Sequence, residues 1–132
     1  MKKILFITVR NPFSGRYSGD VIRSEKFANY LSRKSKVQVV SLGEDKATRI
    51  KKNLEHKSFK RMSALFIIVQ ILKQILKINP IHFAFFYSVK MKKFINKNIN
   101  DYELIFCQSI RAFQYLPIQL RKKIVLDMGD LY

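Results

Sequence analysis

The sequence of 132 residues predicts an α/β protein in which helices flank a parallel β-sheet. Short apolar runs rich in β-branched residues alternate with stretches of helical periodicity along the chain. The first run, the helical stretch after it and the second run all end by Leu42, and together they have the size of one strand-helix-strand unit with a right-handed crossover. Hydrophobic residues make up 48% of the chain, so a packed core is expected despite a net charge of +17.

The first strand-helix-strand unit contains a long connection between its strand and its helix. A short apolar run rich in β-branched residues, typical of a strand buried on both faces, leads into a connection of ten residues. Connections from strand to helix usually have about 2–6 residues, and longer ones are more often binding loops. The predicted elements are a strand over Lys3 to Val9, the loop Arg10 to Gly19, a helix over Asp20 to Lys34 capped by Ser18 or Asp20, and a second strand over Lys36 to Leu42.

The rest of the chain predicts further helices and strands. One helix is apolar nearly all round, which fits either a core helix packed on the sheet, the interpretation we favour, or a helix at a membrane surface. In chain order we expect a helix and loop over Glu44 to Lys60, the apolar helix over Ser63 to Lys77, a short strand or extended segment over Ile81 to Tyr87, a basic helix over Ser88 to Asn98, a strand over Glu103 to Gln108, a short helix over Ser109 to Leu116 and a strand over Lys123 to Asp127.

Several classes of protein are excluded by composition. The single cysteine, Cys107, rules out an internal disulfide framework, and its apolar surroundings predict a buried, inert thiol in a reducing compartment such as the cytoplasm. The first apolar run ends at Arg10, too early for a secretory signal, and no run reaches the roughly 18 apolar residues of a membrane span. Two isolated histidines and one cysteine give no metal-ligand spacing, and we expect no cofactor.

The positive charge is concentrated in the middle of the chain. Between Lys46 and Lys97 there are 13 lysines or arginines and one acid, Glu55. Such a field attracts phosphates, whether of lipid head groups or of nucleic acid, although a solvated basic surface has the same composition. The apolar helix lies within this region, so peripheral contact with an anionic membrane is one expectation.

The loop after the first strand is the best candidate for a site, because ligands bind beyond the carboxyl ends of parallel strands. It lacks both the G-x-G-x-x-G pattern and a Gly-Lys-Ser/Thr step, so neither a dinucleotide nor a P-loop site is predicted. Gly15 and Gly19 permit close approach of a ligand to the backbone, and Asp20 can accept a proton from a hydroxyl. Arg23 can pair with Asp20 or with a phosphate. The plainer alternative is that Gly19 and Asp20 only turn the chain and cap the helix.

The opening stretch KILFITVRNPFSGRYSGDVIRSEKFANYLSRKSKVQVVSLG resembles the start of many family 4 glycosyltransferases of the GT-B fold. That family has a strand, a loop with proline and glycine, a Ser-Gly-Asp or Gly-Gly-Asp step and an arginine three residues further on. The segments FYSVKMKKFI, DYELIFCQSIRAFQYL and IVLDMGDLY resemble later parts of the family in the same order. The resemblance covers nearly the whole chain and implies a Rossmann-like domain.

The resemblance implies that residues 1–132 are the N-terminal, acceptor-side domain of such an enzyme. The enzyme would move a sugar from a nucleotide-sugar to a glycan or lipid-linked acceptor in cell-surface polysaccharide synthesis, on the cytoplasmic side of the membrane. Asp20 would be the catalytic residue. The acceptor-binding residues would be Gly15, Gly19, Arg23, Gln108, Arg111, Asp127 and Asp130, for which ordinary roles at a helix surface, a strand end or a turn remain open.

The sequence departs from the family in one major respect. The family binds the nucleotide-sugar in a second domain through two glutamates eight residues apart, and no two glutamates of this chain have that spacing. We therefore expect the donor domain to be absent and the chain alone to be inactive. Neither histidine, His56 or His82, has the surroundings of a catalytic one; solvated or packed side chains are expected.

Two other functions remain open. A nucleic-acid-binding domain would explain the net charge and the aromatic residues, but the sequence has no helix-turn-helix, RNP or zinc-finger pattern, so no specific nucleic acid is expected. A small α/β interaction module without catalytic activity is the other alternative.

Overall fold

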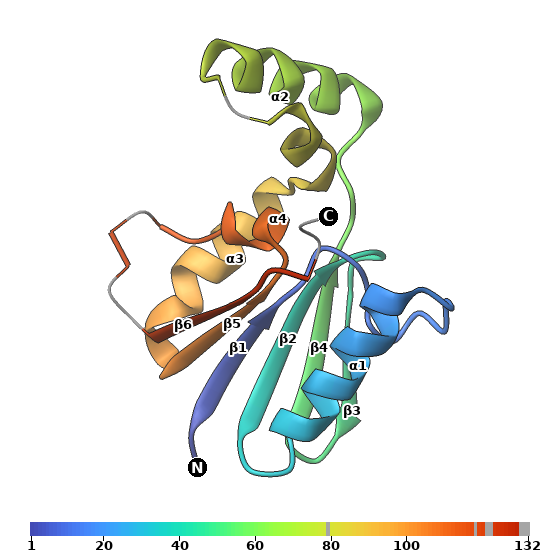
Figure 1. Ribbon diagram of the computed structural model, residues 1–132, viewed down its shortest axis with the longest axis vertical. Coiled ribbons are helices and arrows are strands. Elements are labelled where there is room, and N and C mark those ends of the chain that lie inside the picture. Colours follow the sequence, from blue (N-terminus) through green and yellow to red (C-terminus); the bar gives the residue numbers. More distant parts are fainter. Residues whose placement is uncertain (79, 118, 121–122, 130–132) are drawn as a thin grey trace.

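The computed structural model describes residues 1–78, 80–117, 119–120 and 123–129. Its centre is a six-stranded sheet with helices on both faces (Figure 1). The strands are β1 (Lys3–Ile7), β2 (Lys36–Leu42), β3 (Lys46–Lys51), β4 (Leu54–Phe59), β5 (Leu104–Gln108) and β6 (Lys123–Asp127). The helices are α1 (Gly19–Leu31), α2 (Ala64–Leu76), α3 (Val89–Asn98) and α4 (Ile110–Phe113), with 3-10 helices η1 (Ile81–Phe86) and η2 (Ile99–Asp101).

The sheet order is β3-β4-β2-β1-β5-β6, and all neighbouring strands are parallel except the antiparallel pair β3 and β4. Counted among the parallel strands alone, the order is 3-2-1-4-5, the arrangement of a Rossmann-like sheet. In chain order, β2 and β4 are added on one side of β1, and β5 and β6 are then added on its other side. This reversal leaves a crevice between the carboxyl ends of β1 and β5, and the predicted α/β class with a parallel sheet is confirmed.

The core has two layers because side chains of a strand alternate between the faces of the sheet. In β1, Leu5 and Ile7 belong to the cluster that packs against α3, whereas Ile4 and Phe6 belong to the cluster that packs against α1. These four residues are 0–4% exposed, so the prediction of a first strand buried on both faces is confirmed. Cys107 of β5 is also fully buried, and burial raises the pKa of its thiol to about 12, as expected for an inert cysteine.

The segment from Glu44 to Lys60 was expected to be a helix and a loop, and this prediction was wrong. It forms the β3–β4 hairpin, in which Lys46 pairs with Ser58 and Arg49 with Glu55. Buried and exposed positions alternate along most of β4, but the buried positions include His56 and Ser58, which are polar. The usual apolar alternation of a strand is therefore missing from the sequence. The charged, exposed β3 protects the edge of the sheet against pairing with other chains.

The apolar helix does not pack on the sheet, so the favoured interpretation of Ser63 to Lys77 as a core helix was wrong. None of the residues of α2 is buried, and its main packing partner is η1. The helix lies beyond the carboxyl ends of the strands, away from the two core layers (Figure 1). The segment η1 was expected to be extended and is a 3-10 helix begun by Pro80. Among the described residues, no helix has the length and apolarity needed to cross a membrane.

Candidate functional site

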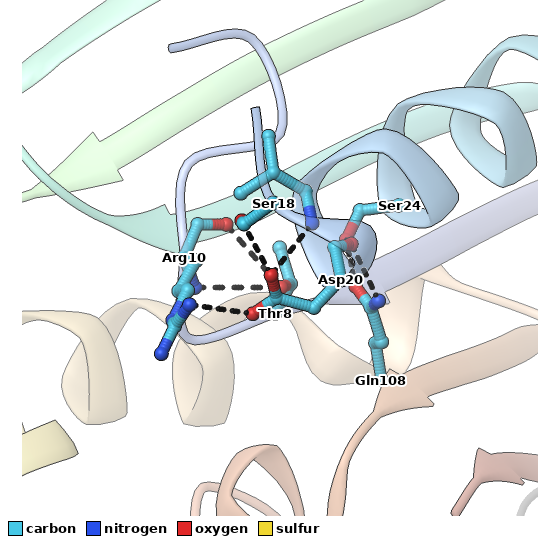
Figure 2. Close-up of polar contacts among 7 residues, drawn as sticks. Thr8, Arg10, Ser18, Asp20, Ser24 and Gln108 are labelled. Carbon is cyan, nitrogen blue, oxygen red and sulfur yellow. Dashed lines mark hydrogen bonds and ion pairs between the residues drawn. The ribbon is translucent and has the colours of Figure 1, made fainter. Parts of the chain in front are cut away.

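Polar side chains gather at the crevice between β1 and β5. They come from the end of β1, the loop after it, the first turns of α1 and the end of β5, so residues 88 positions apart in sequence meet there (Figure 2). They surround a small hollow of about 10 Å³. Ligands of open parallel sheets bind at this switch point. The hollow is lined by Thr8, Val9, Arg10, Asp20, Gln108, Ser109 and Arg111.

The carboxylate of Asp20 is the centre of this cluster. One oxygen, Oδ1, accepts hydrogen bonds from the hydroxyl of Ser18 at 2.6 Å and from the backbone N–H of Val21 at 3.0 Å. The other oxygen, Oδ2, pairs with the guanidinium of Arg10 at 3.0 Å. Figure 2 shows Arg10 reaching Asp20 from the loop, on the opposite side from Ser24 and Gln108. Because both partners of the ion pair are partly exposed, the pair is weak and can exchange with a ligand.

Gln108 holds the first turn of α1 against the end of β5. Its side-chain amide donates to the backbone oxygen of Asp20 at 3.0 Å, and its amide oxygen accepts a hydrogen bond from the hydroxyl of Ser24. Gln108 is 6% exposed. Its role in the structure is therefore to position Asp20 rather than to present a free group to a ligand.

Arg23 and Asp127 form the second polar connection at this edge. The guanidinium donates from Nε at 3.0 Å and from its terminal nitrogen at 2.6 Å, so the pair is bidentate and joins α1 to the end of β6. The sequence suggested Asp20 as one partner for Arg23, but the carboxylate in this pair is Asp127. Gly129 lies directly against the guanidinium, where a Cβ atom would collide with it. Asp130, predicted as a site residue, lies outside the described residues.

Ser109 is a site residue that the sequence did not single out. Its φ of 73° and ψ of 153° lie in a region that is essentially restricted to glycine. Its backbone N–H donates to the carbonyl of Asp127 at 2.8 Å, which holds this conformation in place. The side-chain hydroxyl is buried and has no hydrogen-bond partner within the described part of the chain. Strain and an unsatisfied hydroxyl at one residue are typical of binding sites, and no sequence motif signals either.

Of the remaining predicted site residues, some lie at the polar cluster and others are exposed to solvent away from it. Arg111 lines the hollow and stacks its guanidinium 4.9 Å from the ring centre of Phe86. Gly19 begins α1 next to Asp20, but a Cβ there would meet nothing within 4 Å. Gly15 has a φ of +73° and turns the loop in solvent, away from the cluster. Its role in the structure is conformational.

The histidines have the packed or exposed surroundings that the sequence predicted. His56 is 4% exposed, hydrogen-bonds Ser41 at 2.8 Å and stacks edge-on with Phe13. Burial, helped by the charge of Lys46, lowers its pKa to about 4. His82 is exposed beside Phe83. Within the residues that the structure describes, no group of three or more potential metal ligands occurs.

A larger hollow, of about 370 Å³, lies at the opposite edge of the sheet. Four cations contribute to its wall, together with Glu55, Asp101 and Tyr102. It opens at the amino ends of the strands, where parallel sheets rarely bind their ligands. We therefore assign the site to the carboxyl ends of the strands, although the hollow there has the smaller volume. The cations are Lys3, Lys36, Arg49 and Lys52.

Comparison with known protein families gives no match to any family model, and no curated protein matches the chain either.

Proposed function

We propose that this chain is the acceptor-side domain of a GT-B glycosyltransferase related to family 4, acting on a glycan or lipid-linked acceptor. The observation that carries the proposal is the polar cluster around Asp20 at the switch point of a 3-2-1-4-5 parallel sheet. The resemblance of the sequence motifs supports it independently, because Ser-Gly-Asp and the arginine three residues further on both contribute to this cluster and to the neighbouring ion pair.

In this function the acceptor lies over the hollow, with the hydroxyl to be glycosylated beside Asp20. The acceptor displaces Arg10 from the carboxylate, and the freed Oδ2 accepts a hydrogen bond from that hydroxyl. During transfer, the bond between the anomeric carbon and the nucleotide diphosphate breaks, and a bond to the acceptor oxygen forms. The hydroxyl proton passes to Asp20, and the nucleotide diphosphate leaves. The resemblance assigns the nucleotide-sugar to a second domain.

The cluster also supplies the rigidity that such positioning requires. Gln108 and Ser24 fix the backbone of Asp20, and Ser18 fixes one oxygen of its carboxylate. The strained Ser109 adds a buried hydroxyl whose hydrogen-bonding capacity is unused within the described residues. A sugar ring offers many hydroxyls, so a site of this kind can satisfy these groups on binding.

A binding panel tests the proposal. The chain is titrated with mono- and disaccharides and with short isoprenyl phosphate sugars, and affinity is followed by saturation-transfer NMR. The Asp20→Asn variant, which keeps the shape but removes the charge, is expected to bind at least about tenfold more weakly, the range for a lost charged hydrogen bond. The matched control is Glu25→Gln, an exposed residue of the same helix. Equal affinity of Asp20→Asn and the control would overturn the assignment.

A further inference from the structure

The outer face of α2 is an apolar surface that nothing in the described structure covers. Its six exposed large aliphatic residues recur at intervals of three and four, so they form one stripe along the helix. Each is 41–84% exposed, although exposed stripes of helices in soluble proteins are normally polar. Phe66 and Ile67, which are not part of the stripe, are only partly buried. The stripe consists of Leu65, Ile68, Val69, Leu72, Ile75 and Leu76.

The apolar surface continues past the end of the helix. Ile78 is 95% exposed, and Ile81 and Phe85 of η1 are 46% and 49% exposed. Large apolar side chains seldom gather in this way on the surface of a monomer unless the patch binds something. We call the stripe together with these three residues the α2 surface.

The charges that flank α2 in the sequence are all of one sign. Lys60 and Arg61 precede the helix, Lys73 lies within its last turn and Lys77 follows it. From residue 56 to residue 100 the sequence has nine lysines or arginines and no aspartate or glutamate. A surface that is apolar along one stripe and flanked by cations is complementary to an anionic lipid bilayer, where aliphatic side chains enter the acyl boundary and cations meet phosphates.

We propose that the α2 surface docks the protein on an anionic membrane, with α2 lying in the plane of the interface. The 13 residues of α2 extend for about 20 Å, well short of the roughly 30 Å of a hydrocarbon core, so an orientation along the surface fits its length. A second copy of the chain fits less well, because it would bring the same cations and a net charge of +17 against this face.

The position of the α2 surface gives the docking a consequence for the candidate site. The helix α2 lies beyond the carboxyl ends of the strands (Figure 1), which is also where the hollow lies, and Arg111, which lines the hollow, stacks on Phe86 of η1. Membrane docking therefore brings the hollow close to lipid head groups. If the proposed function holds, on which this step alone rests, the acceptor is a lipid-linked one.

Vesicle co-sedimentation of the full chain tests the docking without any sugar transfer. Vesicles are made of phosphatidylcholine alone or with one third phosphatidylglycerol, at about 0.1 M salt, where the Debye length is about 10 Å. The double variant Ile68→Asp/Leu72→Asp is compared with Tyr17→Asp/Tyr30→Asp, which makes the same change of charge at exposed residues outside the α2 surface. The variant Ile68→Ala/Leu72→Ala shortens the same side chains without adding charge.

We expect the chain to bind the vesicles with phosphatidylglycerol and to bind pure phosphatidylcholine at least about tenfold more weakly. The Asp variant of the α2 surface should lose at least about tenfold in partitioning and the Ala variant several-fold, while the tyrosine control stays within about threefold of the original chain. Equal losses in both Asp variants would overturn the proposal, since they would indicate a response to net charge alone. So would a dimer, seen by sedimentation velocity, that forms without vesicle binding and is lost in both α2 variants.

Discussion

Ser109 has a backbone conformation that glycine adopts with far less strain, since its φ is 73° and its ψ is 153°. Such strain costs about 1–3 kcal/mol, whereas the extra flexibility of glycine in the unfolded chain costs about 0.5–1 kcal/mol. We therefore predict that Ser109→Gly raises the free energy of unfolding by about 1 kcal/mol in urea denaturation. If Ser109→Gly instead destabilises the protein by a similar amount, the strained conformation is not present.

The same substitution separates stability from function. In the proposed site the buried hydroxyl of Ser109 serves the acceptor, so the more stable Ser109→Gly variant should bind the best saccharide of the panel several-fold more weakly. Ser109→Ala removes the hydroxyl and keeps the strain, so it should lose the same affinity but lack the part of the stability gain that comes from relieving the strain. Unchanged affinity in both variants would remove Ser109 from the site.

His56 makes the stability of the protein depend on pH. Its pKa is about 4 in the folded state against about 6.5 for an ordinary histidine, so between these values the unfolded chain binds a proton that the folded protein does not. The free energy of unfolding is therefore unaffected by the protonation of His56 above pH 6.5, and it decreases by up to about 3 kcal/mol as the pH falls toward 4. Urea denaturation at pH 7 and pH 5 measures it, and in His56→Gln the loss between these two values should be clearly smaller. An equal loss in His56→Gln would assign the pH dependence to other groups.

At the scale of elements, α2 should contribute little to folding. Its residues are all at least partly exposed, so we predict that Ile68→Ala/Leu72→Ala changes the free energy of unfolding by less than about 0.5 kcal/mol per substitution. The matched control is Ile95→Ala in α3, a fully buried residue whose truncation should cost about 2–5 kcal/mol. A loss of comparable size in the α2 variant would mean that the helix is part of the core.

The elements also differ in how well the sequence predicts them. β1, β2 and β5 are largely buried on both faces and are dominated by apolar residues, so the sequence predicts all three as strands. β4 was missed because His56 and Ser58 occupy buried positions in it, and its partner β3 is exposed at every position except Ile50. The apolar pattern of α2 predicts a helix but not its environment, because core and membrane surface favour the same residues.

The candidate site was predictable only for the residues that have a local signal in the sequence. The position of Asp20 follows from the rule for parallel sheets, and its neighbour Gln108 follows from the end of a predicted strand. The pairing of Arg23 with Asp127 needs the strand order, because it joins residues 104 positions apart. The backbone of Ser109 depends on its hydrogen bond to β6, so it has no local signal in the sequence.

For the whole molecule, the net charge of +17 leaves nucleic-acid binding as the competing function. Filter binding with single- and double-stranded oligonucleotides at rising salt distinguishes nucleic-acid binding from the proposed function in sugar transfer. If the protein binds oligonucleotides only through its net positive charge, its affinity for them should be lost at moderate salt, about 0.2 M. The reason is that non-specific binding depends on the release of counterions from the phosphates. Tight binding that persists there, and that Lys or Arg substitutions abolish, would favour the nucleic-acid function over sugar transfer.

The most direct test of the central claim is to map where an acceptor binds, because the two hollows lie at opposite edges of the sheet. Backbone amide shifts of the chain are recorded by NMR while the best saccharide of the panel is added. We predict shifts at the carboxyl edge, around Arg10, Asp20 and Ser109, that disappear in Asp20→Asn and persist in Glu25→Gln. Shifts confined to the amino edge, around Lys36, Asn53 and Tyr102, or no shift with any saccharide, would contradict the account.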